Sequence, residues 1–140
     1  MFDLDENQPE ITPRAEPRSE AEVLDAYSAT VIGAVERAGP AVVHIAVAAS
    51  QGRGGTGSGF IVSADGLILT NSHVVSGARS IAVSTSDGQR AQARIIGEDP
   101  DTDIAVIRSD ANLAVPALAL SDSKSVKVGQ LAVAIKGRHS

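Results

Sequence analysis

The feature that most constrains the fold is a succession of short apolar runs, many of them rich in β-branched residues, between residues 41 and 135. The runs are AVVHIAVAA (41–49), GFIVS (59–63), LILTN (67–71), SIAVSTS (80–86), AQARIIG (91–97), DIAVIRS (103–109) and GQLAVAI (129–135). Turn-forming segments such as ADG (64–66) and SDGQ (86–89) separate them. Runs of this kind, with no helical periodicity between them, predict strands joined by turns. Six or seven short strands in succession predict an all-β sandwich or barrel.

The first 39 residues differ in character from this strand-rich part. Residues 1–18 are acidic and rich in proline and have almost nothing to bury, which predicts disorder. The run SEAE then predicts a helix over residues 19–39, with Ser19 as N-cap and Glu22 as its capping-box partner, ended by Gly39-Pro40. Apolar residues recur along this segment at helical spacing and predict an amphipathic helix that packs on the barrel. The predicted contact face consists of Leu24, Tyr27, Val31 and Val35.

Charge and composition exclude several classes of partner. The net charge of −5 argues against nucleic-acid binding, which needs clustered Lys and Arg. The absence of cysteine excludes disulfides and a thiolate nucleophile. No apolar run approaches the ~18 residues of a membrane helix, and the acidic start does not resemble a secretory signal. We therefore expect a soluble chain without a membrane partner, cytoplasmic as written.

A glycine-rich run, GRGGTG (52–57), matches the dinucleotide-binding fingerprint by its letters. That fingerprint requires a helix after the glycines and an acidic residue ~20 positions further on. Here the strand-like run SGFIVS follows, and the next acidic residue is Asp65. The run is therefore expected to be a flexible hairpin loop, or to contain glycines with a structural role. No His, Asp or Glu cluster has the spacing of a metal site either, so we expect neither a cofactor nor a metal.

His73 lies where the apolar run LILTN ends, and Asp103 lies immediately before the apolar run that begins at Ile104. A histidine that acts as general base needs one ring nitrogen facing the substrate and the other bonded to an orienting acceptor. A carboxylate at the start of a strand is suited to that second role. Spacing alone leaves two alternatives open: a catalytic His–Asp pair, or a turn histidine half covered by its neighbours.

Three segments in fixed order closely resemble the HtrA (DegP-like) family of trypsin-like serine proteases: GSGFIVSADGLILTNSHVVSGA (57–78), IIGEDPDTDIAVIR (95–108) and LSDSKSVKVGQLAVAI (120–135). The resemblance covers about Val35 to Ile135. It implies a two-barrel chymotrypsin-like fold, in which residues 41–135 form the first barrel behind one amphipathic helix. It also implies that His73 is the general base and that Asp103 orients it.

The same resemblance places the nucleophilic serine in a G-N-S-G-G type loop on the second barrel, beyond Ser140. None of the serines after Asp103 has a glycine beside it, and neither Ser58 nor Ser72 is expected to replace the nucleophile. The final residues, KGRHS (136–140), depart from the family pattern and are interpreted as an unrelated tail. We therefore expect a truncated serine endopeptidase that is inactive alone.

Two other interpretations stay open. The chain could be a non-catalytic binding or regulatory module that joins a full-length protease or a separate second-barrel chain, or a product without function. Complete relatives act on unfolded or peptide substrates, and most work in the cell envelope. In those relatives segments at the position of the predicted helix help chains to form trimers, which implies a possible homo-oligomer.

Overall fold

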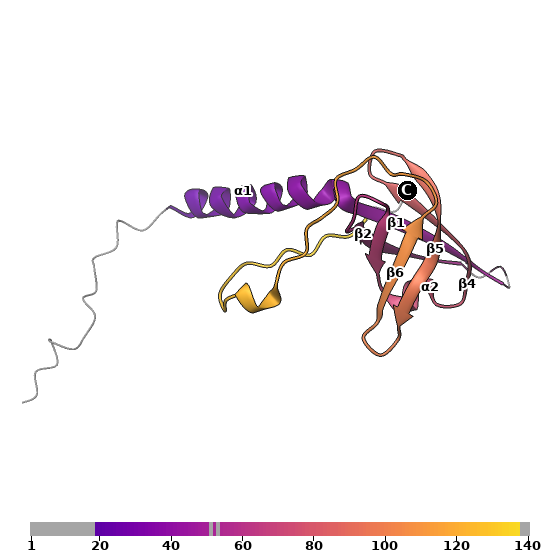
Figure 1. Cartoon of the computed structure of the whole chain (residues 1–140). Coiled ribbons are helices and arrows are strands. Elements are labelled where there is room, and N and C mark those ends of the chain that lie inside the picture. Colours follow the sequence, from indigo (N-terminus) through magenta and orange to yellow (C-terminus); the bar gives the residue numbers. More distant parts are fainter. Residues whose placement is uncertain (1–18, 51, 53, 138–140) are drawn as a thin grey trace, which may run out of the picture.

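The computed structural model describes residues 19–50, 52 and 54–137, and within them six strands form a closed barrel (Figure 1). The strands are β1 (Val42–Ala49), β2 (Gly54–Ile61), β3 (Leu67–Thr70), β4 (Ala78–Thr85), β5 (Arg90–Asp99) and β6 (Ile104–Ser109). Their order around the wall is β1-β2-β3-β6-β5-β4, and every neighbouring pair is antiparallel, including β1 with β4. The predicted mostly β fold, an antiparallel barrel preceded by one helix, is confirmed. The disorder expected for residues 1–18 lies outside the described residues.

Aliphatic side chains from alternate strand positions fill the barrel. Successive side chains of a strand point to opposite faces, so Val43 and Ile45 of β1 both point inward. Ile45, Ile68 and Ile107, from three strands, are 0% exposed and meet in the same core. Burial of each such side chain contributes roughly 1.5–3 kcal/mol. With aromatics at only 2% of the sequence, this core is built from Ile, Val, Leu and Ala.

Residues 54–57 of the glycine-rich run belong to a strand, so the expected hairpin loop is wrong for this part of the run. β2 begins at Gly54, so the glycines do not open a helix. A Cβ atom at Gly59 would lie 2.7 Å from the carbonyl oxygen of Leu69, and one at Gly57 would lie 2.6 Å from the side chain of Val74. These two glycines therefore let β3 and the segment after it approach β2 closely.

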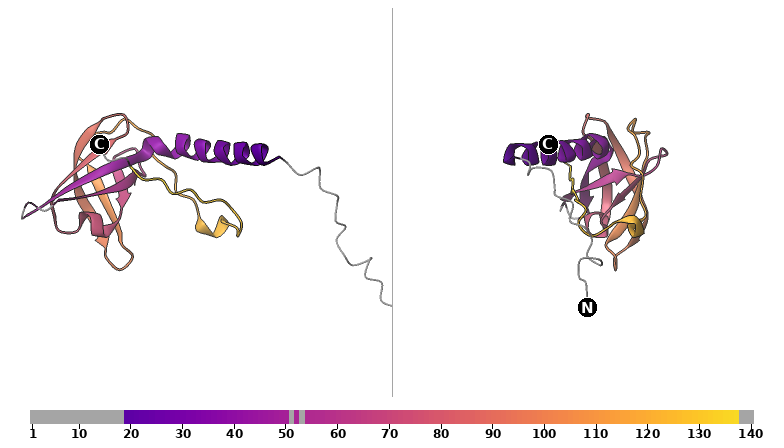
Figure 2. Two further views of the ribbon diagram at one scale, coloured as in Figure 1. Left: turned by 180° about the vertical axis from the view of Figure 1, so that it is seen from behind. Right: turned by 90° about the vertical axis from the view of Figure 1, so that its left-hand side faces the viewer.

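Helix α1 (Glu20–Ala38) begins as predicted, with the Ser19 hydroxyl accepting a hydrogen bond from the Glu22 N–H at 3.3 Å. The prediction that it packs on the barrel through Leu24, Tyr27, Val31 and Val35 is wrong. No residue of α1 is buried, Leu24 is 64% exposed, and the helix projects away from the barrel (Figures 1 and 2). The reason lies at Gly39, whose φ of −52° keeps the backbone helical and leads through the 3-10 turn Gly39–Ala41 directly into β1, with no loop to reverse the chain. None of the helices among the described residues is both long and apolar enough to span a membrane.

The segment that follows β6, residues 110–137, contains no strand, although GQLAVAI (129–135) is predicted to form one. That prediction is wrong for this structure, and the segment's one regular element is the 3-10 turn η3 (Ser123–Ser125). The physical reason is that a closed barrel has no free edge to which a seventh strand could bond. The segment is tied to β2 at two points: the Leu118 N–H donates to the Ile61 carbonyl, and the Gly137 N–H donates to the Ser58 hydroxyl, each at 2.7 Å.

Candidate active site

Neighbouring strands bring His73 and Asp103 to the same end of the barrel. β3 and β6 are antiparallel, and Thr70 at the end of β3 pairs with Ala105 near the start of β6. The residues just after β3 therefore lie beside the residue just before β6. A short helix, α2 (Ser72–Val75), carries His73 there, so two residues thirty positions apart in the chain become neighbours.

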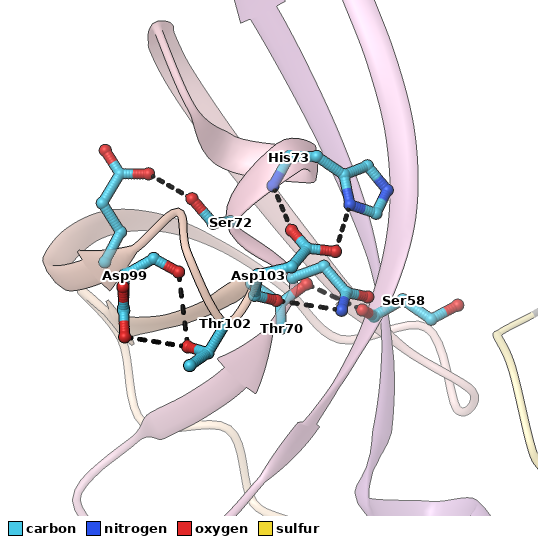
Figure 3. A network of polar contacts seen from close by, with 9 residues as sticks. Ser58, Thr70, Ser72, His73, Asp99, Thr102 and Asp103 are labelled. Atoms are coloured by element: carbon cyan, nitrogen blue, oxygen red, sulfur yellow. Dashed lines mark hydrogen bonds and ion pairs between the residues drawn. The ribbon is translucent and has the colours of Figure 1, made fainter.

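Both oxygens of the Asp103 carboxylate bind His73 (Figure 3). Nδ1 of the imidazole lies 2.7 Å from Oδ2, and the backbone N–H of His73 donates to Oδ1 at 2.8 Å. With Nδ1 occupied in this way, the tautomer with its proton on Nδ1 leaves Nε2 as a free proton acceptor. The contact that selects a tautomer therefore also fixes the orientation of the ring.

The imidazole is open to solvent on the side away from Asp103. The side chain of His73 is 71% exposed and that of Asp103 is 43% exposed. A cavity of about 520 Å³ lies beside the ring, and its lining includes Ser58, Asn71 and Ile135. A molecule in this cavity can reach His73 without any rearrangement of the barrel.

The hydrogen bonds to Asp103 stabilise its charged form. The backbone N–H of His73 is the main cause that lowers the pKa of the Asp103 carboxyl, and the His73 side chain is the next. Partial burial opposes this shift but is the smaller effect. The carboxylate of Asp103 is therefore ionised at any pH above the ordinary pKa of an aspartate.

Two residues that the sequence analysis did not single out, Asn71 and Thr70, make hydrogen bonds that connect the segments around the site. The Asn71 side-chain amide donates to the backbone carbonyl of Asp103 at 3.1 Å. The hydroxyl of Thr70 donates to the carbonyl of Ser58 at 2.8 Å, which joins β3 to β2. The sequence shows a polar residue, Asn71, where an apolar run ends. Nothing in the sequence indicates that its partner is Asp103, thirty-two positions away.

Two other polar residues near the site, Ser72 and Asp99, are engaged elsewhere. Ser72 is buried, and its hydroxyl donates to Glu98 at 2.8 Å, away from the imidazole. The carboxylate of Asp99 accepts hydrogen bonds from the Asp101 N–H and the Thr102 hydroxyl, so Asp99 shapes the turn. Among the described residues no group of three or more His, Asp or Glu side chains could hold a metal ion.

Residues 57–139 match the family described as the trypsin-like peptidase domain, and the chain belongs to that family. Its relatives are HtrA and DegP-like serine endoproteases, as the resemblance predicted. A probable periplasmic serine endoprotease DegP-like from Halomonas elongata is 50% identical over 86 residues, which are 61% of this chain and 18% of the relative. Serine protease HTRA1 from Xenopus laevis is 43% identical over 107 residues, 72% of this chain and 23% of the relative. The chain thus spans about a fifth of the length of these relatives.

Solved structures agree with this membership. The HtrA-type protease AlgW with a tripeptide superposes with a TM-score of 0.64 at 38% identity, covering 69% of this chain and 31% of the other. The serine endoprotease from Yersinia pestis superposes with a TM-score of 0.63 at 32% identity, covering 82% of this chain and 38% of the other. The similarity therefore extends from the sequence to the three-dimensional arrangement of more than two thirds of the chain.

Proposed function

We propose that His73 and Asp103 are the general base and the orienting carboxylate of a serine endopeptidase. The observation that carries the proposal is the two-point contact, in which Asp103 binds both Nδ1 and the backbone N–H of His73. A histidine in a solvated turn needs no such double restraint. Family membership supports the proposal, because the chain matches trypsin-like peptidases through the residues that include this pair.

In the proposed reaction Nε2 of His73 takes the proton from a serine hydroxyl as that oxygen attacks the peptide carbonyl. Asp103 stays ionised and stabilises the imidazolium that forms. His73 then gives the proton to the leaving amine. Asp103 acts by orientation and charge and is not itself protonated during the cycle.

The nucleophile of this reaction is proposed to lie on a second barrel rather than within residues 1–140. The sequence contains no G-N-S-G-G type loop. Ser58, which lines the same cavity as His73, has its hydroxyl engaged by the Gly137 N–H at 2.7 Å. The hydroxyl of Ser109 donates to the Ala111 carbonyl, also at 2.7 Å. Residues 1–140 on their own are therefore proposed to be inactive toward peptide substrates.

The test joins residues 41–135 to the rest of the Halomonas elongata relative, in place of its matching segment, and measures casein hydrolysis. We expect activity in the hybrid, and a loss of about four orders of magnitude in kcat for Asp103→Asn. His73→Ala should reduce hydrolysis at least as far, while Ser58→Ala should leave it unchanged. A hybrid that melts cooperatively and is inactive, or one that keeps its activity after His73→Ala, contradicts the proposal. If the 140-residue chain by itself hydrolyses casein, and His73→Ala abolishes that hydrolysis, the proposed inactivity of the isolated chain is wrong.

A second candidate function is a non-catalytic module that binds a full-length protease or a complementary second-barrel chain. It is favoured by exposed apolar side chains in the segment after the barrel, where Val128 is 108% exposed and Leu131 is 55% exposed. Exposed apolar residues of α1 allow association into homo-oligomers in the same way. Co-purification from the native host tests this, and recovery of a lone monomer contradicts it.

The cytoplasmic location expected from the sequence is tested by fractionation of the native host, since relatives are described as periplasmic.

A further inference from the structure

Asp103 has an unusual backbone conformation. Its φ of +57° is the only positive value among the non-glycine residues that the structure describes. This left-handed region is disfavoured for L-residues, although Asp and Asn tolerate it better than most. Such a conformation persists only where surrounding contacts hold it.

The left-handed conformation belongs to the turn that leads into β6. The Asp103 N–H donates to the Pro100 carbonyl at 3.3 Å, and Ile104 then pairs with Asp99 of β5. Asp103 is thus the residue at which a tight turn becomes a strand, and its carboxylate leaves the turn toward His73 (Figure 3). The direction of that carboxylate depends on the backbone conformation of Asp103.

Asn71, the residue that follows β3, contacts the backbone of Asp103. Its side-chain amide donates to the backbone carbonyl of Asp103 at 3.1 Å. Asn71 occupies the N-cap position of α2, where an asparagine side chain normally accepts a hydrogen bond from the helix, yet it makes no such capping bond here. The side chain of Asn71 bonds Asp103 instead of capping α2.

We propose that Asn71 is a positioning residue of the candidate active site: its amide holds Asp103 in the left-handed conformation from which the carboxylate binds His73 at two points. The inference rests on the proposed function of the pair. Asn71 acts through Asp103 and takes no part in proton transfer.

The test uses amide hydrogen exchange in the 140-residue chain. Asn71→Ala and Asn71→Ser should each reduce the protection of the His73 amide about three- to tenfold, the effect of losing one neutral hydrogen bond. Ser retains an N-cap side chain but is too short to reach Asp103, so full protection in Asn71→Ser would overturn the proposal by assigning Asn71 a capping role. Unchanged protection in Asn71→Ala would overturn it as well. Asn112→Ala, at an exposed asparagine outside the site, is the matched control, and protection of the Ile107 amide in β6 shows that the barrel stays folded.

A second readout separates this inference from the proposed function. In Asn71→Ala the pKa of Asp103, followed by carboxylate NMR, should rise toward its ordinary value, and an unchanged pKa overturns the inference. In the hybrid protease the same substitution should lower kcat and leave KM unchanged, because the proposed role of Asn71 is to position Asp103 and not to bind substrate; a change confined to KM overturns the inference. A parent hybrid that melts cooperatively and is inactive refutes the proposed function, while the exchange and pKa measurements still decide the role of Asn71.

Discussion

The barrel and the segment after it contain apolar runs of similar composition, but these runs have different structures. SIAVSTS (80–86) forms most of β4, with Ile81 and Val83 buried, whereas GQLAVAI (129–135) has Leu131 exposed and pairs with nothing in the described part of the chain. Both runs have the apolar character of a strand. The first has β1 and β5 on its two sides, and the second reaches a barrel that is already closed. The comparison indicates that an apolar run of this kind forms a strand only where the edge of another strand is free to pair with it.

The candidate active site belongs to the first of these two regions. His73 lies just after β3 and Asp103 just before β6, and the core residue Ile68 in β3 lies opposite Ile107 in β6. A closed barrel restrains both strands, so the distance between base and carboxylate is set by the core. Substitutions should therefore have unequal effects in the barrel and outside it.

The largest expected effect contrasts the core with α1. Ile68→Ala should lower the free energy of unfolding by about 2–5 kcal/mol, because it leaves a cavity among fully buried side chains. Leu24→Ala, on the exposed helix, should change it by no more than about 0.5 kcal/mol. Urea denaturation of the two variants measures both values. Equal losses would show that α1 packs on the barrel in solution.

The next effect compares two glycines of β2. Gly59→Ala should destabilise the chain by about 1–3 kcal/mol, since the new Cβ would lie 2.7 Å from the Leu69 carbonyl and 2.9 Å from Ile68. Gly55→Ala is the matched control, because nothing lies within 4 Å of a Cβ at that position. Thermal melts should separate the two variants. If they melt alike, β2 is not packed closely against β3.

A smaller effect concerns pH. The folded-state pKa of Asp103 is lowered, so the stability it contributes is present above the ordinary Asp value of about 3.9 and is lost as the pH falls through the lower folded value. His73→Ala should raise the pKa of Asp103 only in part, because the backbone N–H of residue 73, the main cause of the shift, remains. Carboxylate NMR titration measures this. A complete return to the ordinary value would mean that the imidazole alone is responsible.

The smallest effect marks the boundary between the two regions. Ser58→Ala removes the acceptor of the Gly137 N–H and should leave the free energy of unfolding within about 0.5 kcal/mol of its original value. Hydrogen exchange of the Gly137 amide should nevertheless become faster, with the Leu118 amide as an unchanged control. Loss of stability comparable to that of a core substitution would place residue 137 within the cooperative unit of the barrel.

Much of the fold was predictable because local patterns specify it. The runs that became β1 to β6 show β-branched residues between turn formers, and the capping box at Ser19 and Glu22 indicated the start of α1 correctly. Two predictions failed for one physical reason, which is that contacts with distant parts of the chain decide packing. The apolar face of α1 predicted a contact with the barrel that the structure does not make. Residues 129–135 predicted a strand, but the closed barrel offers no free edge to pair with it.

By itself, the sequence determined most of the strand segments, the bounds of the helix, the aliphatic composition of the core and, through family resemblance, the candidates His73 and Asp103. Tertiary structure alone decided that β1 pairs with β4 to close the barrel, that α1 projects from it, and that Asn71 binds the carbonyl of Asp103. Local periodicity and turn chemistry act over a few residues and can be read along the chain. The contact between Asn71 and Asp103 joins positions thirty-two residues apart, and it exists only because β3 and β6 are neighbours in the closed barrel.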